Sequence, residues 1–227
     1  MPAHPHLFDA VVLAGGRSSR LGGTDKPGLV VGGQTLLGSV VSAVTSAGAA
    51  RVVVVGPERP AVPGAGAQGG LPLTYTREEP PGRGPVAALR CGLAEVSAPA
   101  LVLAAADLPF LRPAHVARLL AALAGPAGAG PARAGAVALD AAGRPQWLLS
   151  AWASALLRGV LDGYAGSSLR GLLAPLDPVL LPDETAAGQP PPWLDCDTAE
   201  DLRLARDWAA RAGSHAAQAG SGQEAAR

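Results

Sequence analysis

Residues 11–29 read VVLAGGRSSRLGGTDKPGL, and this stretch decides how the chain folds. An apolar run stops at two glycines, and three cations, Arg17, Arg20 and Lys26, follow in close succession. A buried strand that opens into a glycine-rich turn is typical of an anion-binding loop, because glycine lets backbone N–H groups come close to a phosphate. The stretch is not a dinucleotide fingerprint, which needs G-x-G-x-x-G. It is not a P-loop either, because Pro27 follows Lys26 where Ser or Thr would stand.

A solvated surface turn with scattered charge is the alternative interpretation of this loop. Lys26 is the only lysine among 18 basic residues, and the other 17 are arginines. The one lysine lies in this loop. Lysine offers a compact point charge on a thin stem, whereas arginine offers a broad planar fork. Chance alone could also leave one lysine, but its place after a buried strand favours an anion site.

Composition excludes several classes of protein. The chain has 227 residues with 18 basic and 18 acidic side chains, which argues against binding to nucleic acid or to a membrane surface through bulk charge. No apolar stretch reaches transmembrane length, and the N-terminus lacks the features of a signal peptide. Cys91 and Cys196 form neither a disulfide framework nor a zinc motif. We therefore expect a cytoplasmic protein.

Apolar strand-like runs alternate with segments of helical spacing, which predicts βαβ units and a mostly parallel sheet flanked by helices. The expected strands are 9–15, 51–56, 73–78, 100–107 and 134–140. The expected helices between them are 34–48, 84–96 and 112–125. No linker divides the chain.

The pattern loosens after residue 140, where we expect a strand-to-helix pair over 146–161, a short helix over 167–176, a strand over 178–183 and a helix over 197–213. Thr198 and Asp201 form a variant of the capping box at the start of the last helix. The last segment is small and polar. We therefore expect one domain over residues 1–212 and a disordered tail over 213–227.

Carboxylates stand at two places that suit a metal ion. Asp107 ends an apolar strand, and ligands of open parallel sheets bind beyond the carboxyl ends of strands, where an acid could hold Mg²⁺ against phosphates. A turn former ahead of Pro109 is the alternative. Asp195 and Asp197 are two apart in extended chain and so face one side. Asp197 could instead simply stabilise the start of the last helix through its dipole.

The opening stretch resembles the signature L-A-G-G-x-x-x-R-M-G-x-D-K of the molybdenum cofactor guanylyltransferases, a branch of the MobA-like nucleotidyltransferases. Leu21 stands where Met is usual, and Gly23 is one extra glycine. In the G-P-x-A-G motif, Ala88 replaces the usual Gly. The downstream segments that resemble the family in order are GRGPVAALRCGL (82–93), AADLPFL (105–111), GRPQWLL (143–149), SSLRGLL (167–173) and DCDTAEDL (195–202).

The resemblance implies a three-layer Rossmann-like nucleotidyltransferase fold. It also implies transfer of GMP from GTP to the terminal phosphate of molybdopterin with release of pyrophosphate. Mg²⁺ is the implied cofactor, held by Asp107 and Asp197, and the implied catalytic residues are Arg20, Lys26 and Asp107. Transient contact with proteins that insert or deliver the cofactor is a further expectation. The nucleotide-binding residues that the loop and the resemblance assign are Leu13, Ala14, Gly15, Gly16, Arg17, Lys26, Glu78, Gly84, Pro85 and Asp107.

Base choice stays open at this point. The family commonly has a base-reading Asn at the end of its second strand, where this chain has Val55. Guanine recognition would then rest on backbone groups from Leu13 to Gly15 and on Glu78, with Glu79 as the alternative acid. The rival activities are a molybdopterin cytidylyltransferase, a phospholactate guanylyltransferase and a sugar-phosphate nucleotidyltransferase. A non-catalytic GTP-sensing module is the rival outside enzymes.

Phosphate attack on a nucleotide needs positioning and electrostatics more than proton transfer, since the nucleophile is already ionised. Because this chemistry needs no general base, it is consistent with the position of the histidines, all of which lie outside the motifs. They are His4, His6, His115 and His215.

Overall fold

The computed structural model describes residues 7–15, 25–59, 73–125 and 133–224, with side chains described as far as residue 212. A seven-stranded sheet with the order β5-β4-β1-β6-β8-β7-β9 forms its centre. Its strands are β1 (Phe8–Leu13), β4 (Arg51–Val55), β5 (Leu73–Thr76), β6 (Ala100–Ala105), β7 (Gly135–Leu139), β8 (Pro145–Ala153) and β9 (Val179–Leu181). Every neighbouring pair is parallel except those that β8 makes with β6 and β7.

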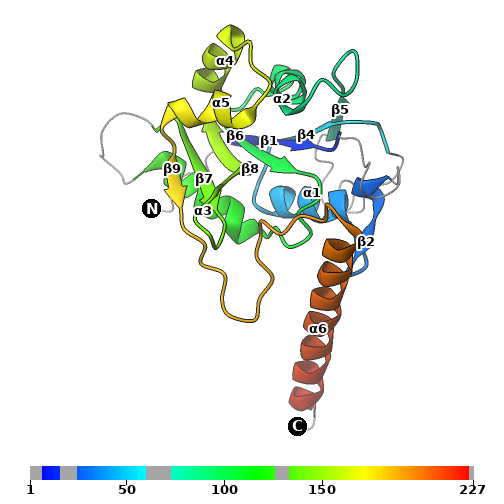
Figure 1. The fold of residues 1–227 in the computed structure, drawn as a ribbon. Coiled ribbons are helices and arrows are strands. Elements are labelled where there is room, and N and C mark those ends of the chain that lie inside the picture. The colour runs from blue at the N-terminus through cyan, green and yellow to red at the C-terminus, as the bar shows by residue number, and fades with distance from the viewer. Residues whose placement is uncertain (1–6, 16–24, 60–72, 126–132, 225–227) are drawn as a thin grey trace.

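Helices cover both faces of this sheet and make three layers (Figure 1). One face carries α1 (Leu36–Ser46) and α3 (Pro113–Ala124), and the other carries α2 (Pro85–Ala94), α4 (Ser154–Gly163) and α5 (Leu169–Leu173). Successive side chains of a strand point to opposite faces. Accordingly Ala10 and Val12 of β1 belong to the first core, and Val11 and Leu13 belong to the second. The continuous apolar run of β1 is thus explained by burial on both sides.

Smaller elements lie beyond the sheet: η2 (Lys26–Gly28), β2 (Val30–Val31), β3 (Gln34–Thr35), η3 (Ala174–Leu176) and α6 (Ala199–Glu224). The start of α6 packs on β2, where Cys196 and Leu202 join Val31 and Leu36 in a third buried cluster. From there α6 runs away from the body of the molecule (Figure 1). Within the described residues, no helix combines the length and the apolar character that crossing a bilayer requires.

The alternation predicted from sequence is confirmed, and so is the mostly parallel sheet between helices. Most predicted ends are shifted by one or two residues, and two differences are described here. The helix expected from residue 34 begins at Leu36, because Gln34–Thr35 pairs with Val30–Val31 and the Thr35 hydroxyl accepts the Gly38 N–H at 3.0 Å as the helix cap. The last helix, expected to end at residue 213, runs to Glu224.

Candidate active site

Strands β1, β4 and β6 end at one edge of the sheet. Leu13 is in register with both Val55 and Ala105. Beyond the strands the backbone stays paired, because the Ala14 N–H donates to Val55 O at 2.8 Å and the Ala106 N–H donates to Leu13 O at 3.0 Å. The sequence segments that carry Gly15 and Asp107 therefore leave the sheet side by side.

Gly56 shows how tightly this edge is packed. A Cβ atom at Gly56 would lie 2.9 Å from the carbonyl carbon and oxygen of Ala14, so only glycine fits between the ends of β1 and β4. Gly15 itself is exposed, and a Cβ atom there would meet only Val55 O, at 3.7 Å. The backbone at Ala14, next to Gly15, is therefore packed closely against the backbone at Gly56.

Lys26 lies between two carboxylates that come from opposite ends of the chain. Its ammonium group, in η2, contacts Asp107 Oδ2 beyond β6 and Asp197 Oδ1 ahead of α6. The Lys26 and Asp107 side chains are only 14% and 17% exposed, whereas Asp197 is 48% exposed. Burial would lower the pKa of Lys26, but the two carboxylates outweigh burial and raise that pKa. Lys26 is therefore a cation at neutral pH.

A second oxygen of Asp107 has no partner within the described residues. Asp107 Oδ1 is buried and accepts no hydrogen bond there, and an unsatisfied buried acceptor is costly unless a ligand completes it. Carboxylate oxygens are the protein ligands that Mg²⁺ prefers, and it commonly takes only one or two of them, with phosphate oxygens and water completing the shell. Among the described residues, no group of three or more acidic, His or Cys side chains is placed to hold a metal ion by itself. Asp107 and Asp197 have the donor chemistry that suits a divalent ion whose remaining ligands are phosphate oxygens and water.

Cys196 orients the second carboxylate segment. Its side chain is buried in the cluster beneath α6, and its two neighbours, Asp195 and Asp197, are exposed. Loss of hydration and the negative charges of Asp197 and Asp107 raise the pKa of Asp195 to about 6, while Lys26 opposes the rise. A cation bound at these carboxylates would relieve the part of the pKa shift that comes from repulsion by Asp197 and Asp107.

The start of α6 is fixed by the predicted capping box. Asp201 Oδ2 accepts from the Thr198 N–H at 2.8 Å and from its hydroxyl at 2.7 Å, and the Thr198 hydroxyl accepts the Asp201 N–H at 3.1 Å. Thr198 and Asp201 thus satisfy the helix end by themselves. Asp197 is therefore not needed as the cap and remains in contact with Lys26.

The other predicted nucleotide contacts lie beside the same edge. Gly84 adopts φ 93°, which favours glycine, and leads into Pro85 at the first turn of α2. Glu78 is buried and accepts the Gly82 N–H at 3.0 Å, whereas Glu79 is exposed. Of the two acids, Glu78 is thus the one built into the loop that precedes α2.

Three of the predicted residues, Gly16, Arg17 and Arg20, lie outside the described residues. One contact was not foreseen. Arg59, after β4, forms an ion pair with Asp25, directly ahead of Lys26. Both residues stand in irregular segments, where no periodicity points to a partner.

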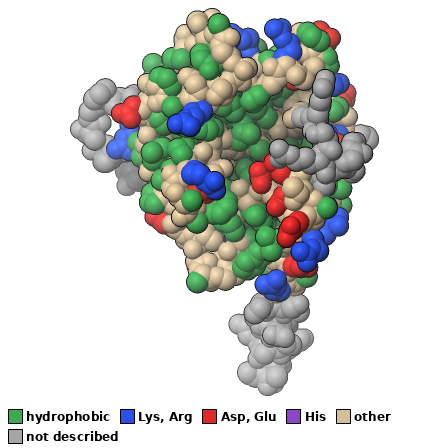
Figure 2. All heavy atoms as spheres, viewed as in Figure 1, with side chains coloured by type: hydrophobic (Ala, Val, Ile, Leu, Met, Phe, Trp, Pro, Cys, Tyr) green, Lys and Arg blue, Asp and Glu red, His purple; other side chains and the backbone are tan. Residues whose placement is uncertain are grey.

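Figure 2 shows acidic side chains gathered at one side of a hollow with a largely apolar floor. Proteins that place a glycine-rich turn and strand-end carboxylates at the carboxyl edge of a parallel sheet bind nucleotide phosphates there. Fold and site together put this chain in that class. Residues 10–179 match the family described as the MobA-like NTP transferase domain, so the protein belongs to that family of nucleotidyltransferases.

The chain is similar to curated relatives and to solved structures, of which three are described here. The chain is 30% identical over 201 residues to the molybdenum cofactor guanylyltransferase of Rhodobacter capsulatus, covering 87% of this chain and 94% of the relative. It is 34% identical over 103 residues to a probable molybdenum cofactor guanylyltransferase of Natronomonas pharaonis, where the match covers 45% of this chain and half of that relative. A Mycobacterium tuberculosis H37Rv protein solved in complex with manganese superposes with a TM-score of 0.61 at 26% identity, covering 88% of this chain and 98% of that one.

Proposed function

We propose that this protein transfers GMP from GTP to the terminal phosphate of molybdopterin and releases pyrophosphate, with Mg²⁺ bound by Asp107 and Asp197. One observation carries the proposal: Lys26 contacts both Asp107 and Asp197, and the chain leaves β1 through Gly15 at the same edge of the sheet where Asp107 leaves β6. The names of the two curated relatives support the guanylyl donor and the molybdopterin acceptor. The manganese in the similar structure supports a divalent ion.

The reaction joins a terminal phosphate oxygen of the acceptor to the α-phosphorus of GTP and breaks the bond from that phosphorus to the bridging oxygen of pyrophosphate. Mg²⁺ would supply positive charge next to the phosphates. Lys26 would contact the phosphate oxygens as charge moves onto the leaving group, and the amides after β1 would hold the triphosphate. No general base is required, because the attacking oxygen is already ionised.

Guanine selection would rest on Glu78 and on the backbone from Leu13 to Gly15. A carboxylate can accept from both the N1–H and the N2 amino group of guanine, a pair of donors that cytosine lacks. One oxygen of Glu78 is already engaged by Gly82, so the carboxylate is held in one orientation. Val55 offers no side-chain polar group for the base, and this leaves a cytidylyltransferase as the second candidate function.

The test measures pyrophosphate release from each of the four NTPs with molybdopterin and Mg²⁺, together with exchange of labelled pyrophosphate into GTP and CTP in the presence of molybdopterin. We expect turnover with GTP only. Turnover with CTP alone would assign the cytidylyl activity, and GTP binding without turnover would indicate a sensor. Activity with a sugar phosphate or phospholactate in place of molybdopterin would reassign the acceptor.

Asp107→Asn tests the assigned metal ligand. It keeps the shape of the side chain, so we expect unchanged thermal stability and a loss of Mg²⁺-dependent turnover of at least ~100-fold, the scale of losing one transition-state contact. Asp162→Asn is the matched control, because Asp162 is 84% exposed on α4. Equal activity in the two variants would make Asp107 a turn former only.

A further inference from the structure

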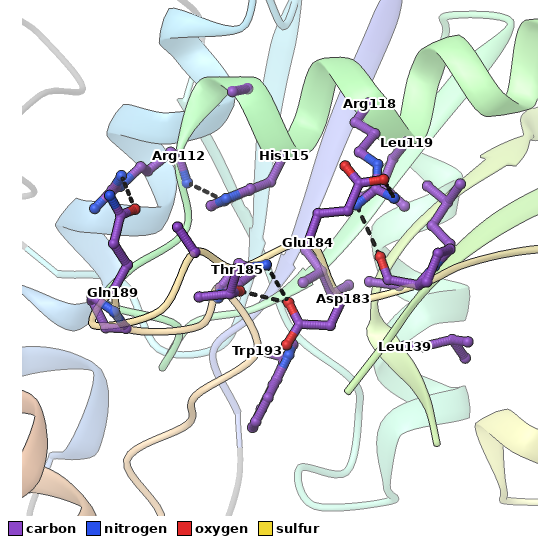
Figure 3. Close-up of a pocket in the computed structure, with 18 residues that line it drawn as sticks. Arg112, His115, Arg118, Leu119, Leu139, Asp183, Glu184, Thr185, Gln189 and Trp193 are labelled. Carbon is purple, nitrogen blue, oxygen red and sulfur yellow. Dashed lines mark hydrogen bonds and ion pairs between the residues drawn. The ribbon is translucent and has the colours of Figure 1, made fainter. Parts of the chain in front are cut away.

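A cavity of about 270 Å³ lies between α3 and the segment 182–193 that follows β9 (Figure 3). None of the residues assigned to the nucleotide or the metal lines it. Its apolar lining comes from α3, β7, β8 and the 182–193 segment, and includes Leu119, Leu139, Leu149 and Trp193. Small-molecule sites typically combine such apolar walls with a few polar groups. This cavity lies just below their usual volume range of about 300–1,000 Å³, so it suits a ligand of about a dozen heavy atoms.

Several polar groups around the cavity are already engaged with one another. Arg118 forms an ion pair with Glu184 at 2.7 Å and donates to Pro182 O at 3.0 Å. Asp183 Oδ1 accepts from the Thr185 N–H at 2.9 Å and from its hydroxyl at 2.5 Å. These contacts hold the segment 182–193 in place, so the groups that make them have few hydrogen-bonding positions left for a ligand.

Arg112 is different. Its guanidinium makes one hydrogen bond, at 3.3 Å, to the neutral amide oxygen of Gln189, and no carboxylate among the described residues forms an ion pair with it. Because that contact uses the Gln189 oxygen, the amide nitrogen of Gln189 is left as a donor. Figure 3 shows Arg112 and Gln189 together at one end of the cavity, with Leu119 and Leu139 at the other.

His115 adds a third donor to the lining. Its Nδ1 accepts the Arg112 N–H at 3.1 Å, so a neutral ring must carry its hydrogen on Nε2. Burial and the charges of Arg112 and Arg118 lower the pKa of His115, which keeps the ring neutral at neutral pH. The end of the cavity at Arg112, Gln189 and His115 therefore offers hydrogen-bond donors, and the apolar walls are interrupted by the Arg118–Glu184 pair and by Asp183.

We propose that this cavity binds a small organic anion, with a carboxylate or phosphate head at Arg112 and a flat apolar body against Trp193 and the leucines. The head would gain a charge-assisted hydrogen bond from a guanidinium that has no acidic partner among the described residues. The body would cover apolar walls that otherwise face water. The bound anion would contact the segment 182–193, and Asp195 follows two residues after its last residue, Trp193.

Calorimetry with 2-naphthoate and with phenyl phosphate tests the proposal, since the two probes represent the carboxylate and phosphate heads. We expect saturable binding to the full-length protein with a Kd below about 1 mM, a typical affinity for ligands of this size. The neutral isostere 2-naphthamide should bind at least ~10-fold more weakly, because it lacks the charge that Arg112 recognises. Acetate and inorganic phosphate, which lack the apolar body, should bind at least ~10-fold more weakly than the matching probe.

Two variants locate the site. Arg112→Leu replaces an exposed guanidinium by an apolar side chain and should weaken binding of both probes at least ~10-fold. Ala138→Leu fills the apolar end and should weaken them by a similar factor, with hydrogen exchange in unliganded protein confirming that it folds. Arg203→Leu, which changes an arginine 72% exposed on α6, is the matched control and should bind like the parent protein.

Hydrogen exchange of the parent protein with 2-naphthoate should slow in peptides from 182–193. Failure of both probes to saturate would overturn the proposal. So would equal binding to Arg112→Leu and the parent, or protection confined to the nucleotide edge.

Discussion

Arg59 forms a two-point ion pair with Asp25, with Nη2 2.5 Å from Oδ1 and Nε 3.2 Å from Oδ2. Arg59 is 13% exposed and also donates to Pro57 O at 3.0 Å, so its guanidinium is fixed from two sides. Asp25 directly precedes Lys26. The segment after β4 therefore restrains the segment that places the ammonium between Asp107 and Asp197.

Arg59→Lys should impair catalysis through this restraint. Lysine keeps the charge but cannot form the planar two-point contact. We expect kcat/KM for GTP to fall about 5-fold, the effect of losing roughly 1 kcal/mol from a partly exposed pair, with the melting temperature lowered by no more than about 4 °C. Steady-state kinetics measures it, with Arg203→Lys as the surface control. Asp25→Asn should cost as much alone, and the double variant should cost little more than either, because the two residues act as one unit. Full additivity of the two losses would show that the pair does not restrain Lys26.

Lys26→Arg should lower turnover by at least ~10-fold although the charge is kept, because the broad guanidinium cannot occupy the narrow place between two carboxylates that an ammonium fills. Single-turnover kinetics with saturating GTP separates this loss from weaker binding. Near-normal turnover would remove Lys26 from the chemistry.

Lys26→Met should strengthen metal binding, although Lys26→Arg should weaken turnover. In the nucleotide-free protein the ammonium neutralises Asp107 and Asp197, so its removal leaves two carboxylates to attract a cation. We expect the Mn²⁺ Kd, measured by electron paramagnetic resonance without nucleotide, to fall about 10-fold, as expected for removing one nearby positive charge in a site of intermediate dielectric. Adding Asp107→Asn should abolish that gain. An unchanged Kd would mean that metal and Lys26 do not share these oxygens.

The sequence predicts the layers and much of the site because each rests on a repeating pattern. Buried strands read as continuous apolar runs, and parallel strands bring their carboxyl ends to one edge, so Lys26 and Asp107 are expected to lie together. Asp195 and Asp197 are expected to share a side, and the buried Cys196 between them explains why they do.

Other features depend on loops, where side-chain periodicity carries no information. The Arg59–Asp25 pair joins two irregular segments 34 residues apart. The cavity owes one wall to the irregular segment 182–193. The reversed direction of β8 follows from its short link to β7, since a parallel neighbour would need a long crossover.

Gly92→Ala should destabilise the protein although alanine is the better helix former. A Cβ atom at Gly92 would lie 2.5 Å from Val11 Cγ1 and 2.9 Å from Val55 Cγ2, between α2 and the central strands. We expect overpacking to cost about 1–3 kcal/mol in urea denaturation. Gly159→Ala on α4 is the matched control, because nothing lies within 4 Å of its Cβ position, and it should stabilise by about 1 kcal/mol. Stabilisation by both would show that α2 can move away from the sheet.

His115 should make stability depend on pH. Burial, together with Arg112 and Arg118, lowers the pKa of its ring below the ordinary 6.5, and Asp183 opposes this only in part. The unfolded chain therefore binds a proton more readily than the folded protein, so the contribution of His115 is complete above pH 6.5 and is lost as pH falls below it. His115→Gln keeps an acceptor for the Arg112 N–H but cannot titrate. Urea denaturation from pH 7.5 to 5.5 should therefore show the variant gaining stability relative to the parent as the pH falls, whereas a constant difference would mean that His115 titrates alike in both states.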